Sequence, residues 1–198
     1  MKRTVLGVIA ALFMMPMMLF SQTYDALWKQ VNKAENDDLP QTQLKVLQQI
    51  VKKAEKELAY GQLLKASLMH ARVQATVSPD SLQPAVERLQ LLAEATQDVA
   101  LQSVYYAVLG KIYASNTQLS DDWQSSRDEY FRKAMEHPAE LAAVKTDGYM
   151  PFVVKGKDSQ LYGDDLLSLI GHETRQFRYF HGMAKCILPV GSTEFHSS

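Results

Sequence analysis

The chain has 198 residues, with 21 basic against 22 acidic side chains and a formal net charge of −1. Such a balance gives no reason to expect nucleic acid or a strongly anionic surface as a partner. The single cysteine, Cys186, excludes an internal disulfide framework. Hydrophobic residues make up 46% of the chain, so packing of apolar side chains must supply the core.

Residues 1–21 have the features of a cleaved secretory signal peptide. Lys2 and Arg3 precede a 16-residue apolar run from Val5 to Phe20, and the small Ser21 offers a cleavage point. The run is shorter than the roughly 20 residues that span a bilayer core, so a retained anchor is the less favoured alternative. Cleavage would leave a charge of −3 (19 basic against 22 acidic). We therefore expect an exported chain, periplasmic or associated with the outer membrane, with no membrane span after cleavage.

Residues 22–146 predict a helical-repeat-like domain, because apolar residues recur there at helical spacing. The first helix is expected to end at residues 36–40, and Tyr60 with Gly61 is expected to break the chain into a tight hairpin. Later helices are expected to begin near Ser81 and Val99 and to span Asp122 to Glu136. The predicted buried stripes are Tyr24, Leu27, Trp28 and Val31; Leu44, Leu47, Ile50, Val51, Ala54 and Leu58; Leu64, Leu68, Ala71 and Ala75; Ala85, Val86, Leu89, Leu92 and Ala93; Val104, Tyr105, Val108, Leu109, Ile112 and Tyr113; and Trp123, Tyr130, Phe131, Ala134 and Met135.

One degenerate repeat motif supports this organisation. The tetratricopeptide pattern W-x2-L-G-x2-Y is matched from Tyr106 to Tyr113, with Tyr in place of Trp, and Gly110 stands at the Gly position. Phe131, Ala134 and Pro138 fit the pattern of the second helix of the repeat. Arg127, however, occupies a position of that helix that needs a small residue. The prediction is an all-α fold of antiparallel helix hairpins in a tetratricopeptide-like stack, in which small residues let neighbouring helices approach closely.

The pattern changes after residue 146. Glycines and Pro151 break any helix over residues 147–163, so an irregular segment with short extended pieces is expected to lie over the helices. A last helix through Leu166 and Ile170 would complete a unit of residues 147–177, with Asp164 or Asp165 as its cap. Residues 178–198 show no helical or strand period and predict an irregular tail, and a truncated chain is one interpretation of this pattern.

No set of residues predicts an active site, a cofactor site or a metal site. His172 and Glu173 begin a zinc-protease helix motif, but Gln176 stands where the second imidazole is needed. Cys186 has no identifiable base, and an incidental thiol is the favoured interpretation. The acidic pairs 121–122 and 164–165 precede helices, where capping is favoured over catalysis or calcium binding. The remaining histidines, which occur singly, are His70, His137, His181 and His196.

Several short blocks of the sequence resemble a known family. Residues 24–31, 38–42, 53–57, 60–66 and 162–170 are similar to the N-terminal helical region of the large, exported alpha-2-macroglobulin-like proteins of Gram-negative bacteria. The resemblance covers roughly residues 1–177. It implies a chain that continues elsewhere into β-sandwich domains, which trap proteases, often with a thioester. This sequence has no thioester motif, and the resemblance therefore implies a truncated or fragmentary member.

Two non-enzymatic functions follow as hypotheses. In the first, the chain is the N-terminal interaction region of an alpha-2-macroglobulin-like inhibitor, whose endopeptidase inhibition would reside in downstream domains. In the second, it is a free-standing periplasmic helical-repeat scaffold that binds peptides or proteins. Both expect a protein partner, and neither expects a cofactor.

Overall fold

The structure is a computed structural model that describes residues 22–78, 80, 82–155 and 163–175. In these ranges the chain forms α-helices, two short 3-10 helices and one isolated antiparallel bridge between Lys145 and Asp165, without a strand. The helices are α1 (Tyr24–Asn36), α2 (Pro40–Glu57), α3 (Tyr60–Val77), α4 (Leu82–Ala95), α5 (Val99–Ser115), η2 (Thr117–Leu119), α6 (Trp123–Ala134), α7 (Pro138–Ala143), η3 (Thr146–Tyr149) and α8 (Leu166–Arg175).

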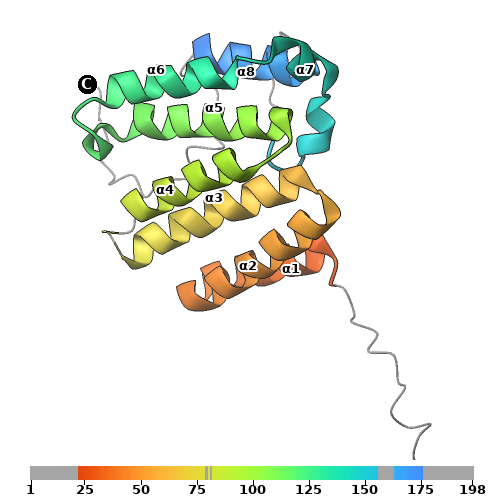
Figure 1. The fold of residues 1–198 in the computed structure, drawn as a ribbon. Coiled ribbons are helices and arrows are strands. Elements are labelled where there is room, and N and C mark those ends of the chain that lie inside the picture. The colour runs from red at the N-terminus through yellow and green to blue at the C-terminus, as the bar shows by residue number, and fades with distance from the viewer. Residues whose placement is uncertain (1–21, 79, 81, 156–162, 176–198) are drawn as a thin grey trace, which may run out of the picture.

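The helices stack in chain order (Figure 1). The α1 and α2 helices form one end, α3, α4 and α5 follow, and α6 lies near α8 at the other end. Each of α1 to α5 packs on the helix that follows it, and the most extensive contacts join α2 to α3 and α5 to α6. The predicted all-α stack of helix hairpins is therefore confirmed.

The start of α8 confirms one predicted cap, whereas the start of α6 corrects another. Asp165 accepts a hydrogen bond from the Ser168 N–H at 2.8 Å, which satisfies a free donor of the first turn. Asp122 precedes α6 but makes no such bond. Its own N–H instead donates to the Ser120 hydroxyl oxygen at 3.1 Å. The prediction of capping at residue 122 was therefore wrong.

The core follows the apolar stripes, with α5 at its centre. This helix buries twelve of its 17 residues, and the six predicted to point inward are all among them. Leu58 is the exception to the predicted stripes, because its side chain is 69% exposed. The residue follows the end of α2 in the left-handed conformation, at φ 52°, so the helix break comes before Tyr60 and not at Tyr60–Gly61.

Close approach of α5 and α6 depends on Gly110, as the repeat motif predicted. A Cβ at this position would lie 2.5 Å from the ring of Phe131, so only glycine lets the aromatic ring rest on the α5 backbone. Arg127, which departs from the motif, is accommodated because its guanidinium lies over the Trp123 ring, 5.4 Å from the centroid. The large side chain therefore covers an aromatic surface and does not separate the helices.

The irregular segment expected over residues 147–163 is described as far as residue 155, and it packs on α3 through η3, as expected. Its first residues form the 3-10 helix η3, where a short extended piece was predicted. The backbone of Tyr149 and Met150 packs directly on the first turn of α3 at Gly61, where a Cβ would overlap the Met150 carbonyl. The short α7 was not predicted. Residues 156–162 and 176–198, and with them the predicted tail and Cys186, lie outside the described part of the chain.

Candidate protein-interaction surface

Three tyrosine rings meet on the surface where α4, α5 and α6 lie together. Tyr113 of α5 stacks on Tyr130 of α6 with centroids 5.6 Å apart and ring planes at 20°. Tyr106 lies two turns earlier on α5, and its ring centroid is 6.1 Å from the Tyr130 centroid. We call these rings, together with Gln90 of α4, the tyrosine cluster. Tyr106 and Tyr130 are half-buried, so each keeps part of its ring on the surface.

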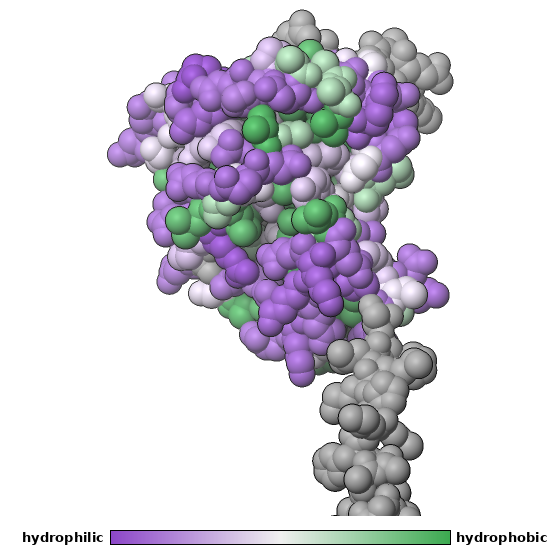
Figure 2. All heavy atoms as spheres, turned by 45° about the vertical axis from the view of Figure 1, so that its right-hand side comes forward, coloured by the Kyte–Doolittle hydropathy of each residue, from purple (hydrophilic) through white to green (hydrophobic). Residues whose placement is uncertain are grey.

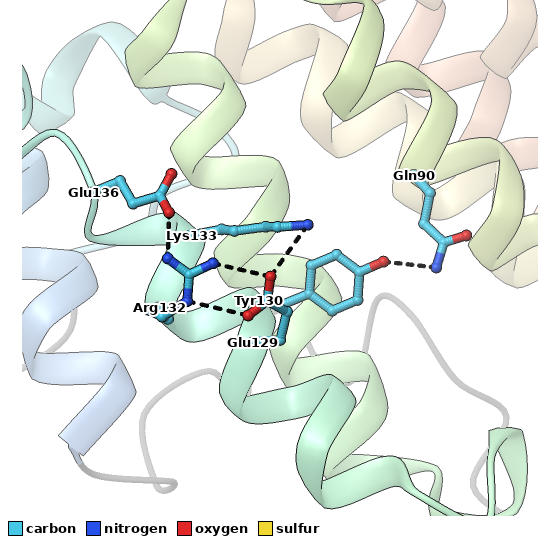
Figure 3. Close-up of polar contacts among 6 residues, drawn as sticks. All are labelled: Gln90, Glu129, Tyr130, Arg132, Lys133 and Glu136. Carbon is cyan, nitrogen blue, oxygen red and sulfur yellow. Dashed lines mark hydrogen bonds and ion pairs between the residues drawn. The ribbon is translucent and has the colours of Figure 1, made fainter.

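Gln90 joins two of the rings by hydrogen bonds. Its Nε2 donates to the Tyr130 hydroxyl oxygen at 2.7 Å (Figure 3). The same Nε2 donates to the Tyr113 hydroxyl oxygen at 3.3 Å. Because both phenol oxygens act as acceptors here, their own O–H hydrogens are available to donate elsewhere. Burial raises the pKa of Tyr130, so the phenol stays protonated and remains a donor at neutral pH.

Charged side chains of α6 border the cluster. The Lys133 ammonium lies 5.6 Å from the Tyr106 centroid and 5.7 Å from the Tyr130 centroid, within cation–π range. It also pairs with Glu129 at 3.5 Å, and Arg132 pairs with Glu129 at 2.9 Å and with Glu136. Figure 3 shows this network along one side of α6. The cluster therefore places two half-buried aromatic rings beside a rim of paired charges.

A second feature is a small polar cavity between α2, α3 and α4. Its volume is about 30 Å³, which is room for roughly one or two waters and too little for a substrate. Burial and, secondarily, Arg88 lower the pKa of His70, which keeps its imidazole neutral near pH 7. The polar lining residues are Glu55, Ser67, His70, Gln74 and Arg88.

This cavity brings together a serine, a histidine and a glutamate that are scattered in the sequence. The arrangement is of a kind that serves nucleophilic catalysis when the three groups are in register. Here Ser67 lies against the buried Tyr105, whose pKa burial raises to about 12 while Ser67 offsets part of the rise. Glu55 is exposed, and the buried Ser67 Oγ has no hydrogen-bond partner in the part of the chain that the structure describes, so no hydrogen bond links the serine to His70 there. Over the described ranges, no group of three or more His, Cys, Asp or Glu residues could hold a metal ion.

One face of the molecule is mainly polar. Figure 2 shows one face on which hydrophilic side chains dominate and apolar ones appear in separate spots. None of the helices among the described residues is both long and apolar enough to cross a membrane. Comparisons with protein families, with curated proteins and with solved structures find no match.

The sequence did not predict the tyrosine cluster as a unit. Tyr113 and Tyr130 were both assigned to inward stripes, and Tyr113 is indeed buried, with 7% of its surface exposed. Gln90 has no special pattern around it and lies 40 residues before Tyr130. A weak signal was present, since Tyr106 replaces the Trp of the repeat motif and adds a further aromatic ring to this surface.

Proposed function

We propose that this chain is a non-enzymatic protein-interaction module that binds a partner through the tyrosine cluster. One observation carries the proposal: the half-buried rings of Tyr106 and Tyr130, from two helices, lie together at the surface, and Tyr130 is hydrogen-bonded to Gln90 of a third helix. Tyrosine is enriched among the residues that dominate binding energy, because its ring buries a large area and its hydroxyl satisfies a polar group.

Two partners are compatible with this surface. In the first proposal the chain is the helical front of an exported alpha-2-macroglobulin-like inhibitor, and the cluster contacts that protein's downstream domains. The support is the sequence resemblance together with the hairpin stack. In the second proposal the chain is a free-standing periplasmic scaffold, and the cluster receives a different protein. The signal-like residues 1–21 support export in both proposals.

Site-specific photo-crosslinking in the cells that produce the chain tests the proposal. A photoreactive phenylalanine would replace Tyr106, and a matched control would carry it at Leu91, which is 65% exposed on α4. We expect one discrete crosslinked protein from position 106 and none from position 91. Equal yields from both positions would contradict binding through the cluster.

The identity of the crosslinked protein separates the two partners. A product with macroglobulin-type β-sandwich domains supports the inhibitor proposal, and an unrelated protein supports the free-standing scaffold. Tyr130→Ala should lower the affinity for the captured partner by tenfold or more, the usual cost of truncating a central aromatic contact of about 2 kcal/mol.

A further inference from the structure

A second concave site lies at the other end of the stack, where the turn between α1 and α2 meets the second half of α3. The concavity is open and measures about 400 Å³, within the range of ligand-binding sites. It involves α1 to α3, whereas the tyrosine cluster involves α4 to α6. Its lining residues are Ala34, Glu35, Asp38, Leu39, Pro40, Gln43, Arg72, Val73 and Thr76.

Gln43 gives this concavity an unusual lining. Its side chain is 5% exposed, and the Nε2 atom has no hydrogen-bond partner among the residues that the structure describes. A buried amide without a partner disfavours folding, and a leucine of similar volume would pack there without that penalty. The amide is thus suited to a group that enters the concavity from outside.

The charged side chains around the concavity favour the binding of a cationic group. Glu35 pairs with Arg72 at 2.9 Å, and Lys33 pairs with Asp37 at 2.6 Å. Within the described ranges this leaves the exposed Asp38 carboxylate without an ion pair. Asp38 adopts the left-handed conformation, at φ 53°, in the turn at the rim. An incoming ammonium or guanidinium group would complete the pairing.

The walls between these polar groups are apolar. Leu39 is 49% exposed, and Pro40 and Val73 extend the same surface. An extended polypeptide segment matches the buried amide, the apolar wall and the exposed Asp38 carboxylate of this concavity. Such a segment offers a backbone carbonyl acceptor beside a long side chain with an apolar stem and a charged tip.

We propose that this concavity binds an extended, basic segment of a partner protein. A backbone carbonyl of the segment accepts a hydrogen bond from Gln43 Nε2, and a neighbouring lysine or arginine pairs with the Asp38 carboxylate. The stem of that basic side chain lies on Leu39 and Pro40. This site is independent of the tyrosine cluster, so each can fail without the other.

NMR titration of the isotope-labelled chain tests the proposal, with the side-chain amide signals of Gln43 as the reporter. The probe is the capped peptide acetyl-Ala-Ala-Lys-Ala-Ala-amide, compared with peptides that carry Glu or Ala at the centre. We expect the lysine peptide to shift the Gln43 side-chain signals and the Asp38 backbone signal in a saturable way. The alanine peptide should act more weakly, and the glutamate peptide least.

Three variants test the individual contacts of the proposed site. Asp38→Asn keeps a residue that tolerates the left-handed conformation and should weaken the lysine peptide about threefold, as expected for a partly exposed ion pair. Gln43→Leu should abolish binding and raise the thermal midpoint. Gln49→Leu, at an exposed position of the same helix, should leave peptide binding unchanged. An unmoved Gln43 signal at millimolar lysine peptide, an equal response to the glutamate peptide, or a lower midpoint for Gln43→Leu would each overturn the proposal.

Discussion

At Gly61 two parts of the chain that are distant in sequence pack directly against each other. It lies in the first turn of α3, and the backbone of Tyr149 and Met150 passes directly over it. Tyr60 and Tyr149 reinforce the contact, with ring centroids 6.0 Å apart. Backbone cannot move aside as the end of a flexible side chain can, so the contact depends on the missing Cβ.

Gly61→Ala is expected to destabilise the protein by about 2 kcal/mol or more, because the added methyl group must displace the η3 backbone. Gly148→Ala is the matched control, since a Cβ at residue 148 would meet nothing within 4 Å. Chemical denaturation of both variants measures the difference. Equal stability of the two would mean that η3 does not pack on α3 in solution.

His70 predicts a pH dependence of stability. Burial and Arg88 lower its folded pKa below the ordinary value, so the unfolded chain binds the proton more readily. This contribution is fully present above the unfolded pKa of about 6.5 and is lost as the pH falls toward the folded pKa. Glu55 of α2 lines the same cavity.

His70→Gln should therefore lose less stability than the wild type between pH 7.5 and 5.5. Denaturation midpoints at the two pH values measure this difference. An identical acid response in His70→Gln would exclude His70 as a source of the dependence.

At the scale of the elements, the caps of α6 and α8 form a natural comparison. Asp165→Ala removes a carboxylate that accepts from the Ser168 N–H at 2.8 Å and the Ser168 hydroxyl at 3.0 Å, and should cost about 1 kcal/mol of unfolding free energy. Asp122→Ala removes a side chain that makes no cap and should cost much less. Denaturation at neutral pH compares the two, and equal losses would contradict the capping geometry.

Helix positions could be predicted from the sequence wherever a long apolar stripe existed, as for α2 and α5. The six-residue α7 could not, because it is too short to show a period and Pro138 reads equally well as a terminator. In the sequence pattern Leu58 continues the apolar stripe of α2, but the helix ends one residue earlier. Periodicity describes a face of a helix and contains no information on where the helix stops.

The two candidate sites could not be predicted from helical periodicity, for a different reason. The tyrosine cluster needs Gln90 to reach Tyr130 across α5, and the concavity needs the α1–α2 turn to face α3. Both depend on how helices distant in sequence are placed side by side. Gln43 even resembles an ordinary surface glutamine in its local sequence, and only packing reveals that it is buried.

At the scale of the whole molecule, the stack has a centre and two ends. The α5 helix buries twelve of its 17 residues, whereas α1 buries three of 13. In arrays where each element mainly contacts its neighbours, the ends open at lower free energy than the middle. Amide hydrogen exchange should therefore be slowest in α5 and clearly faster in α1. Uniform protection across both helices would indicate one all-or-none unit.

The Gly61 contact also has a consequence in time. A ribosome makes the chain from the N-terminus at about 5–20 residues per second, and 88 residues separate positions 61 and 149. Gly61 on α3 is therefore synthesised roughly 4–18 s before Tyr149, which packs over it. During that interval the ring of Tyr60 and the bare backbone at Gly61 are uncovered. A newly made chain thus exposes a patch that the finished protein conceals, and a chaperone could use it to distinguish the two.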